Sequence, residues 1–478
     1  MAYQDILQKK NFIGGEWMSS NNKMAVYDKY SQRLIAEIDL ADQAQINLAI
    51  QKALAVSKVF KKFSMERRIG IIEKLYTQLQ AKAEDFAQLI AAEGGKPISY
   101  ARSEVYRALD NLKTGIREAY LFTGEQIPID YLNGKNKTAY TIRQPLGIVL
   151  GITPFNFPLN LALHKLIPAI AVGAPIVLKP APQAPLTLLA FAKLIENTDL
   201  PKGAISILIT DNENAQILVE DDNIKVFSFT GSDKIGWMLK SLANKKKVLL
   251  EMGGNAAAIV DDAINLQRAA RKLVYGSFLN AGQICISTQR IYVLEHAYED
   301  FLKFFIEETK KIKSGDVRDQ DVINSSMISE KDLLRIKSWI DEAVSQGAKV
   351  LYGGNFYDKK SNIFEPTILS QTNNQMKVNR EEAFAPVVMI EKVRNFAEAI
   401  DLINESRYGL QAGVFTNNLE HIQLAQADLD VGSVIVNDVP GFRIDSMPYG
   451  GIKDSGIGKE GARYVMHDYT ESKLIVIG

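Results

Sequence analysis

The stretch Gly147-Ile148-Val149-Leu150-Gly151-Ile152-Thr153-Pro154-Phe155-Asn156-Phe157 carries the strongest fold signal in the chain. It begins with a short apolar run, which ends at a turn that contains proline and asparagine. Four further apolar runs follow, at residues 176–179, 204–209, 225–229 and 248–250. Helical patterns fill the gaps, for instance at residues 186–196 and 212–219. This alternation predicts a parallel, doubly wound α/β sheet, and such sheets bind ligands at the carboxyl ends of their strands.

Length and composition describe an ordinary globular protein with more than one domain. The chain has 478 residues, 46% of them hydrophobic, which predicts two or three domains. Its 56 basic and 56 acidic residues balance, so charge gives no case for binding nucleic acid or an anionic membrane. Residues 1–10 lack the apolar core of a secretory signal, and prolines and polar residues interrupt the apolar stretch 146–178. The single cysteine excludes an internal disulfide and suits a reducing, cytoplasmic location.

The N-terminal segments mainly predict core structure. Residues 12–17 predict two short strands around a glycine turn, and helices are expected over residues 42–60, 65–93 and 99–122. Residues 131–143 are polar, contain the turn signal Asn-Gly and then alternate in polarity. That pattern fits a protruding hairpin and a disordered surface loop about equally well.

Two polar residues follow the first two apolar runs. Asn156 lies in a turn stiffened by two prolines, where a fixed carboxamide is a good donor to a developing oxyanion, although an asparagine that caps its own turn is the commoner case. Lys179 ends the second run, where it can meet a ribose hydroxyl or a phosphate, or can simply be solvated before a proline-rich loop.

Two further motifs follow the later runs. A helix is expected to start at Ser232, after a turn at Gly231, and the bare N–H groups of a helix start can hold a pyrophosphate. The glycine spacing is not that of an ordinary dinucleotide fold, so this signal is weak by itself. Glu251 ends a buried run beside two glycines, where a partly desolvated carboxylate is a candidate general base or else an ordinary strand-end residue.

Cys285 is the only cysteine, and small and polar residues surround it in the segment 280–290. This fits a loop or helix start that presents a thiol to a cleft, and helix N–H groups would lower its pKa. The alternative is a small buried hydrophobic residue, a common fate of free cysteine.

Together these segments resemble the aldehyde dehydrogenase superfamily over nearly the whole chain, from residues 12–17 to residues 448–456. The motifs that match in order and spacing lie at residues 153–159, 178–182, 229–232, 251–254, 280–290, 381–386 and 404–410. The resemblance implies an α/β fold with two doubly wound α/β domains and a small β bridging element. A cofactor domain would comprise residues 1–124 and 146–251, a catalytic domain residues 252–450, and an oligomerisation element residues 125–145 and 468–478. It also implies a homodimer or a homotetramer.

The resemblance further implies roles for particular residues. Cys285 would be the nucleophile, Asn156 would complete the oxyanion hole, and Glu251 would activate the water that hydrolyses a thioester to a carboxylic acid. Relatives that release a coenzyme A thioester tend to lack that glutamate. The residues implied in binding NADP or NAD are Thr153, Pro154, Phe155, Lys179, Pro182, Gly231, Ser232, Gly253, Glu382 and Phe384.

The resemblance leaves alternatives for the preferred cofactor and for the substrate. Pro182 stands where many NAD-preferring relatives have a glutamate, so NADP is expected to be accepted, as preferred cofactor or beside NAD. Residues 438–449 resemble the subgroup that oxidises lactaldehyde, glyceraldehyde and semialdehydes. Arg107 and Arg443 could face an anionic substrate tail or be structural ion-pair partners, whereas Phe157 and Ile284 would make the pocket partly apolar and suit a small aldehyde. A non-enzymatic protein on this fold and a thiol esterase are the competing classes.

Overall fold

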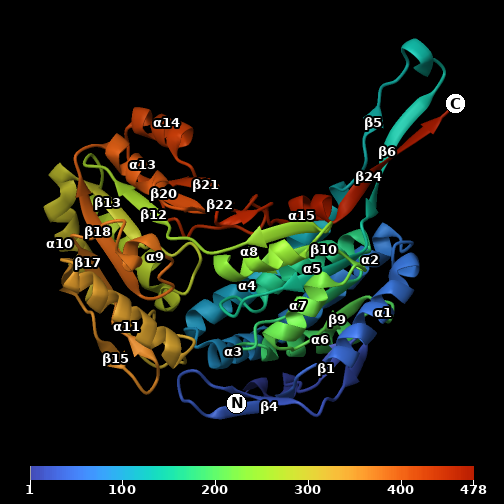
Figure 1. Ribbon diagram of the computed structural model, residues 1–478, viewed down its shortest axis with the longest axis horizontal. Helices are drawn as coiled ribbons and strands as arrows, with labels where there is room; N and C mark the ends of the chain where they lie inside the picture. The colour runs from blue at the N-terminus through green and yellow to red at the C-terminus, as the bar shows by residue number, and fades with distance from the viewer. Residues whose placement is uncertain (1) are drawn as a thin grey trace.

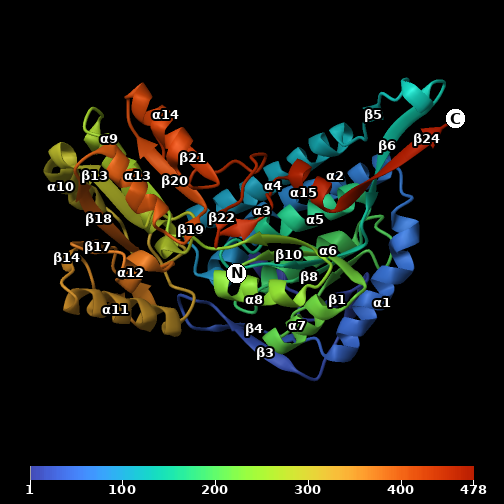
Figure 2. The ribbon, with the colours of Figure 1, turned by 45° about the horizontal axis from the view of Figure 1, so that its top comes forward.

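Two α/β bodies lie side by side, and a narrow arm projects from one of them (Figures 1 and 2). The structure is a computed structural model that describes residues 2–478; Met1, the first residue of the expected cofactor domain, lies outside the described residues. Among residues 2–478 no helix is long and apolar enough to cross a membrane. Within the same residues no group of three or more His, Cys, Asp or Glu side chains is arranged to hold a metal ion.

The first body is built on an eight-stranded sheet with a parallel centre. Its strands, in spatial order, are β2 (Glu16–Met18), β1 (Asn11–Ile13), β9 (Ile205–Ile207), β8 (Ile176–Lys179), β7 (Ile148–Ile152), β10 (Ile224–Thr230), β11 (Lys247–Glu251) and β23 (Gly456–Ile457). The central strands β9, β8, β7, β10 and β11 are parallel, while β1 and β23 pair antiparallel at the two sides. The predicted parallel sheet of short strands is confirmed, and it brings the carboxyl ends of four motif-bearing strands to one edge.

Helices of this body cover the sheet and bury its apolar side chains in two clusters. They are α1 (Gln43–Phe60), α2 (Met65–Ala81), α3 (Ala83–Gly94), α4 (Ile98–Leu121), α5 (Asn160–Val172), α6 (Leu186–Glu196), α7 (Asn212–Glu220), α8 (Asp233–Leu242) and α15 (Ala462–Asp468). The prediction of one helix over residues 65–93 is wrong. Lys82, with φ −116° and ψ 16°, leaves the helical region and separates α2 from α3. A two-stranded sheet of β3 (Lys23–Tyr27) and β4 (Leu34–Asp39) completes the body.

The second body carries a seven-stranded sheet. Its strands, in spatial order, are β14 (Lys349–Tyr352), β17 (Thr367–Ser370), β18 (Val387–Val393), β13 (Arg290–Leu294), β12 (Ala257–Val260), β20 (Gln411–Phe415) and β21 (Ser433–Val436). Its helices are α9 (Leu266–Phe278), α10 (Tyr298–Thr309), α11 (Glu330–Ser345), α12 (Lys377–Arg380), α13 (Phe396–Asn404) and α14 (Leu419–Asp428). Two small pairings, β15 (Phe356–Asp358) with β16 (Ile363–Phe364) and β19 (Tyr408–Gly409) with β22 (Ile452–Lys453), flank it. The expected fold class, two doubly wound α/β bodies with a small β element, is confirmed.

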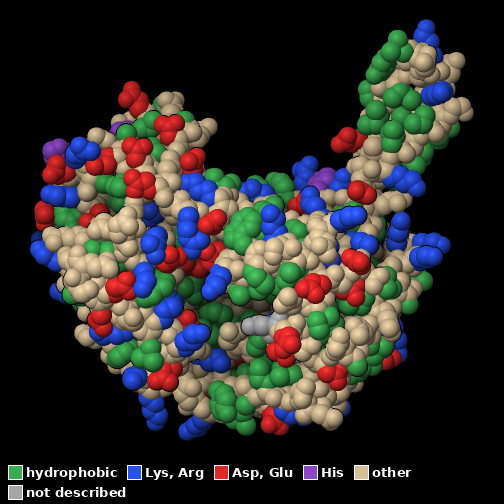
Figure 3. All heavy atoms as spheres, viewed as in Figure 1, with side chains coloured by type: hydrophobic (Ala, Val, Ile, Leu, Met, Phe, Trp, Pro, Cys, Tyr) green, Lys and Arg blue, Asp and Glu red, His purple; other side chains and the backbone are tan. Residues whose placement is uncertain are grey.

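The arm is a three-stranded antiparallel sheet made of β5 (Gln126–Ile127), β6 (Thr138–Pro145) and β24 (Thr470–Ile477). β24 pairs with β6 along its whole length, from Thr470 opposite Pro145 to Ile477 opposite Thr138. β5 also pairs antiparallel with β6, so residues 131–143 form part of a protruding hairpin, and the disordered-loop alternative is wrong. Hydrophobic side chains gather on this arm (Figure 3).

Candidate active site

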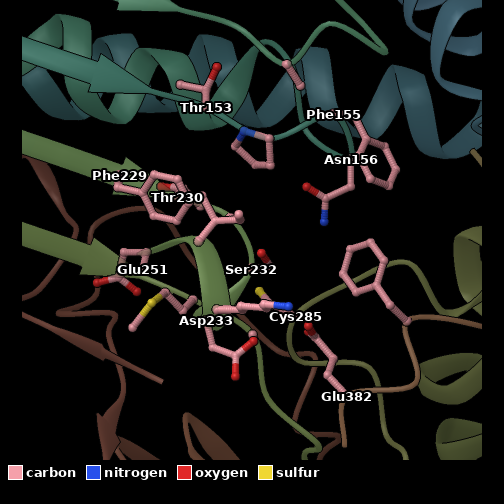
Figure 4. Close-up of a pocket in the computed structure, with 18 of the residues that line it drawn as sticks. Thr153, Phe155, Asn156, Phe229, Thr230, Ser232, Asp233, Glu251, Cys285 and Glu382 are labelled. Carbon is pink, nitrogen blue, oxygen red and sulfur yellow. The ribbon is translucent and has the colours of Figure 1, made fainter. Parts of the chain in front are cut away.

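One cavity of about 620 Å³ lies at the carboxyl ends of β7, β8, β10 and β11 and is closed on the other side by segments of the second body. The predicted residues that line it are Thr153, Pro154, Phe155, Asn156, Lys179, Pro182, Gly231, Ser232, Glu251, Gly253, Cys285, Glu382, Phe384 and Arg443. Figure 4 shows how several of them point into this space from different segments. Phe157, Ile284 and Arg107, which the sequence suggested for the substrate, lie outside this lining.

Cys285 lies on a turn between a short 3₁₀ segment, Leu279–Gly282, and β13. Asn280 and Ala281 have φ angles of 55° and 53°, which non-glycine residues rarely adopt. Gly282, at φ 66°, continues this backbone, and a Cβ there would lie 2.1 Å from the carbonyl oxygen of Ala385. Such strain persists only when the surroundings impose it, and it clusters at functional sites. The expected helix start at Cys285 is wrong, whereas the loop is correct.

The side chain of Gln283 fixes this turn. Its Nε2 donates to the carbonyl oxygens of Asn280 and Ser326, each at 3.2 Å, and its Oε1 accepts from the Ile328 N–H at 2.9 Å. Its own carbonyl oxygen accepts from Asn156 Nδ2 at 2.9 Å. The Asn156 amide is therefore bonded to the cysteine turn, and the alternative that it caps its own turn is wrong.

The surroundings of Cys285 disfavour the charged thiolate form of its side chain. Burial raises the pKa of this thiol to about 11, because a thiolate loses its hydration, while the Tyr449 hydroxyl acts in the opposite direction. The sulfur lies 3.0 Å from Tyr449 Oη. The pKa reduction expected from a helix N-terminus is absent, because no helix begins at the cysteine.

Glu251 is the last residue of β11, and its side chain is buried. Its Oε2 has no hydrogen-bond partner among the described residues, and a Cβ at position 450 would lie 2.7 Å from its Oε1. Burial and then the nearby Glu460 raise the pKa of Glu251 well above its ordinary value. An unpaired, buried carboxyl oxygen that faces a cavity is suited to take a proton from a water molecule there.

Behind Glu251 lies a buried ionic network that sequence reasoning missed. Lys165 donates to Thr230 Oγ1 at 2.7 Å and lies 3.5 Å from Glu460, which in turn pairs with Arg443 at 2.9 Å. Burial alone would raise the pKa of Glu460, but His164, Lys165 and Arg443 lower it to about 2. The only sequence signal is faint: a lysine beside a histidine in a mostly apolar helix, and a glutamate about 300 residues away in the chain.

The cavity extends from Glu251 towards Lys179, and its lining suits a dinucleotide. Burial lowers the pKa of Lys179 to about 8, so the ammonium would gain from an anionic partner. Ser232 precedes α8 without a side-chain cap, which leaves the first N–H groups of that helix available at the cavity. Asp233, in the same turn, is neutralised by Arg407 at 2.6 Å. A pyrophosphate group fits such a helix start.

At the opposite wall, the Glu382 carboxylate approaches the backbone closely. The Gly254 N–H donates to Glu382 Oε1 at 3.2 Å, and a Cβ on Gly253 would lie 2.1 Å from Glu382 Oε2. Burial raises the pKa of Glu382 to about 8. Phe384 has a φ of 45°, and its ring packs edge-on against Phe155 at a centroid distance of 5.8 Å. Glycine at 253 and a strained backbone at 384 hold a carboxylate and a ring at the cavity wall, which suits a ribose.

The two candidate substrate arginines are held by carboxylates. Arg107 Nη2 lies 2.7 Å from Asp445 Oδ1, and Arg443 contacts both Glu460 and His164. Burial alone would raise the pKa of Asp445, but His164 and Arg107 hold it well below its usual range. Arg107 therefore has the structural ion pair that was the alternative to substrate binding. Arg443 also has ion-pair partners, but it lines the cavity as well.

The two remaining substrate candidates lie beside the cavity. Phe157 is buried, with Lys96 Nζ 3.9 Å from its ring centroid and Tyr100 packed edge-on against it. Ile284 lines a separate, very small pocket beside Gly254 and Glu382. Neither side chain contributes to the walls of the main cavity.

Comparison with known proteins places this geometry in a family. The family model described as "Aldehyde dehydrogenase family" matches residues 17–475. The chain is 41% identical over 468 residues to 3-sulfolactaldehyde dehydrogenase of Priestia aryabhattai, covering 98% of this chain and 97% of that protein. It is 38% identical over 472 residues to lactaldehyde dehydrogenase of Methanococcus maripaludis, covering 98% and 99%.

Solved structures agree with the sequence comparison. Aldehyde dehydrogenase 21 of Physcomitrella patens, in complex with the reaction product succinate, has a TM-score of 0.95 at 38% identity, with 98% of each chain covered. Glyceraldehyde-3-phosphate dehydrogenase of Methanocaldococcus jannaschii, complexed with NADP, has a TM-score of 0.92 at 35% identity, covering 96% of this chain and 100% of that one. The chain therefore belongs to the aldehyde dehydrogenase family and is an oxidoreductase that acts on small aldehydes with NADP or NAD.

Proposed function

We propose that this protein oxidises a short 2-hydroxyaldehyde of the lactaldehyde type to its carboxylic acid, with Cys285, Asn156 and Glu251 as catalytic residues. The observation that carries the proposal is the shared cavity: a thiol, a fixed carboxamide and a buried carboxylate with an unpaired oxygen line one space. A degenerate protein on the same fold would have no reason to retain all three.

The nucleophile and the oxyanion donor act first. The Cys285 thiolate attacks the aldehyde carbonyl carbon and forms a thiohemiacetal whose oxygen carries the negative charge. Asn156 donates one amide hydrogen to Gln283, so its second amide hydrogen is available for that oxygen. The Cys285 backbone N–H is the second donor. Because the asparagine and the cysteine turn are joined by a hydrogen bond, the donor does not need to reorganise as the charge develops.

Glu251 acts in the second half-reaction. A bound NADP or NAD supplies the acceptor for the hydride that leaves the substrate carbon, and a thioester on Cys285 remains. Glu251 then takes a proton from water, which attacks the thioester and releases the carboxylic acid. Burial and the nearby Glu460 raise the pKa of this carboxylate, so Glu251 itself can hold the proton that it accepts.

The cofactor is proposed to lie along the rest of the cavity. Lys179 and Glu382 would hold ribose hydroxyls, and Gly231 and Ser232 would lie at the pyrophosphate. The remaining contacts would come from Thr153, Pro154, Phe155, Pro182, Gly253 and Phe384. Residues 1–124 and 146–251 would form the cofactor domain and residues 252–450 the catalytic domain; the proposal is supported by the strands of residues 148–251 and 257–436, which lie in separate sheets.

NADP is the proposed preferred cofactor. Pro182 lines the cavity with Lys179, so a 2′-phosphate would meet an ammonium and no carboxylate from position 182. The NADP complex of the methanogen relative is consistent with this preference.

A second candidate substrate is a short aldehyde with an anionic tail, such as a semialdehyde. One relative acts on a sulfonated lactaldehyde, and a solved relative contains succinate. Three buried or half-buried cations, Arg107, Arg443 and Lys165, face only two low-pKa carboxylates, Asp445 and Glu460. Of these cations Arg443 lines the cavity, where its guanidinium would favour an anionic tail.

The arm is proposed to join copies of the chain into a homodimer or a homotetramer, through residues 125–145 and 468–478. Leu474 and Val476 on β24 are 57% and 52% exposed, and the arm tip exposes Tyr131 and Leu132. Contiguous exposed apolar surface of this kind usually marks an interface. We place the enzyme in the cytoplasm, a reducing compartment in which a nucleophilic thiol stays reduced.

The experiment is an absorbance assay at the reduced-nicotinamide band. Purified protein is mixed with NADP or NAD and with lactaldehyde, glycolaldehyde, succinate semialdehyde, propanal or benzaldehyde. The proposal expects reduction to be fastest with NADP and lactaldehyde. A clear lead for succinate semialdehyde would replace the substrate proposal with its anionic alternative, and the absence of reduction with every pair would refute both.

A further inference from the structure

Tyr449 is the polar neighbour of the proposed nucleophile, and the roles assigned above do not use it. Its hydroxyl oxygen lies 3.0 Å from Cys285 Sγ, and the residue is 3% exposed. The guanidinium carbon of Arg443 lies 3.8 Å from the centroid of its ring, so a buried cation covers one face of the phenol. The phenol thus contacts the sulfur through its hydroxyl and the guanidinium through its ring.

Backbone and side-chain bonds through Glu460 hold both Tyr449 and Arg443 in place. Tyr449 and Glu460 exchange two backbone hydrogen bonds, of 3.2 and 2.6 Å, across an isolated bridge. The Glu460 carboxylate in turn accepts from Arg443 Nη2 at 2.9 Å. The segment that places the phenol under the guanidinium therefore also holds the guanidinium in place.

The chemistry of the thiol requires such a partner. Burial disfavours the thiolate, yet the thiolate is the species that attacks a carbonyl. A hydroxyl that donates to a thiolate forms a charge-assisted hydrogen bond and favours the charged form. A cation held against the ring draws electron density from the phenol and makes its O–H a stronger donor.

We propose that Tyr449 donates a hydrogen bond to the Cys285 thiolate, and that Arg443, stacked on the tyrosine ring, strengthens this bond and so favours the ionised form of the nucleophile. The thiol proton passes to solvent water, and the Tyr449 O–H bond is not broken. When the sulfur bonds to the aldehyde carbon it loses its charge, and the hydrogen bond weakens as the charge moves to the oxygen near Asn156.

This role differs from substrate binding, which is the other use of a hydroxyl at this position. A thiolate donor acts before the aldehyde arrives, so its loss should lower kcat/KM by the same factor for lactaldehyde and for propanal. A donor to the substrate 2-hydroxyl group would penalise lactaldehyde alone. The inference rests on the proposed role of Cys285, and the test below is independent of turnover.

The test is the pH dependence of Cys285 alkylation by iodoacetamide, followed by whole-protein mass. Cys285 is the only cysteine, so every alkylation event reports this thiol. Tyr449→Phe removes one oxygen atom, and we expect it to raise the inflection of the rate by about one pH unit. Below the inflection the rate should fall about tenfold, while the limiting rate at high pH stays the same.

Tyr292→Phe is the matched control. Tyr292 is also buried, and its hydroxyl accepts from Arg290 at 3.3 Å, but it lies on β13 away from the cavity lining. It should leave the inflection unchanged. Incorporating 3-fluorotyrosine at position 449 keeps the size and makes the phenol more acidic, so it should lower the inflection. An unchanged or lowered inflection in Tyr449→Phe, or an equal rise in Tyr292→Phe, would overturn the proposal.

Failure of this inference is distinguishable from failure of the proposed function. Cys285→Ala should abolish aldehyde oxidation whether or not Tyr449 tunes the thiol. Normal turnover by Cys285→Ala would refute the proposed mechanism, whereas an unshifted alkylation profile in Tyr449→Phe would refute only the hydrogen-bond role.

Discussion

Glu251 shows how position alone changes the chemistry of a common side chain. It is buried at the end of a strand, and one of its oxygens has no partner in the described structure, so the protonated form is favoured. A general base must be ionised before it can act. Arg443 and Lys165 oppose the upward shift of the Glu251 pKa and so favour its ionised form.

The proposed role of Glu251 predicts how hydrolysis depends on pH. Because the pKa of this carboxyl is raised, its basic form becomes populated only as pH rises through that raised value, so the rate of thioester hydrolysis should rise with pH. Steady-state rates at saturating aldehyde, measured from pH 5 to 9, check this. A rate that falls as pH rises from 5 to 9 would contradict it.

Pro182 makes a prediction about cofactor choice. Pro182→Glu introduces a carboxylate beside Lys179, where a 2′-phosphate would lie, and like charges about 4 Å apart cost on the order of 1 kcal/mol or more. The ratio of kcat/KM for NADP to that for NAD should fall about fivefold to tenfold. Pro201→Glu, at a turn outside the cavity lining, is the control. An unchanged ratio in Pro182→Glu would count against Pro182 as a determinant of cofactor choice.

For single residues, the sequence predicts the site residues that follow strands. It misses the site residues that come from segments distant in the chain. Asn156, Lys179 and Glu251 each follow a short apolar run, so the edge they share could be predicted. Tyr449 and Glu460 could not, because their meeting with residues 160 to 300 positions earlier depends on how β23 joins the first sheet.

Among the elements, α4 and α5 are joined by the buried carboxylate of Glu104, close to the proposed oxyanion donor Asn156. Glu104 on α4 pairs with Lys96, and both are about 1% exposed. Its other oxygen accepts from the Leu159 and Asn160 N–H groups, at 3.0 and 3.2 Å, where α5 begins. One carboxylate therefore caps α5, neutralises a buried lysine and fixes the turn that carries Asn156.

Glu104→Ala should lower the free energy of unfolding by about 3–5 kcal/mol, because it leaves the Lys96 charge buried and unpaired. Urea denaturation followed by circular dichroism measures this loss. Glu84→Ala, which removes an exposed pair with Arg102, should cost less than about 1 kcal/mol. Equal losses in the two variants would show that burial does not govern the Glu104 pair.

Two element predictions failed for local reasons. The apolar spacing of residues 65–93 runs through Lys82, but periodicity does not report a single residue that leaves the helical region. Around Cys285, small polar residues fitted both a loop and a helix start, and the left-handed backbone at Asn280 and Ala281 excludes the helix. The next residue, Gly282, passes so close to Ala385, distant in sequence, that a Cβ there would lie 2.1 Å from its carbonyl oxygen.

Across the whole molecule, Arg407 links the two bodies at the main cavity. Its guanidinium pairs with Asp233 on α8 of the first body and with Glu381 of the second, at 2.6 and 2.8 Å. The cavity therefore lies between two bodies held in a defined relation. The arm extends away from both, with the chain terminus on its outer strand (Figure 1).

The arm predicts assembly. A double variant, Leu474→Asp with Val476→Asp, places two charges on the exposed apolar face of β24 and should dissociate the proposed oligomer to monomers. Light scattering coupled to gel filtration measures the mass. Lys473→Asp with Glu471→Lys, on the alternate positions of the same strand, is the control and should assemble normally. A wild-type protein that is monomeric at micromolar concentration would contradict the prediction.

The most direct test of the central claim is the intact mass of Glu251→Gln after one turnover with NADP and the best aldehyde of the panel. The account predicts one rapid equivalent of reduced nicotinamide, slow turnover afterwards, and an acyl group on Cys285 that is absent in Cys285→Ala. Turnover at the wild-type rate with no acyl group on the protein would contradict the role of Glu251 in hydrolysis and the thioester route with it.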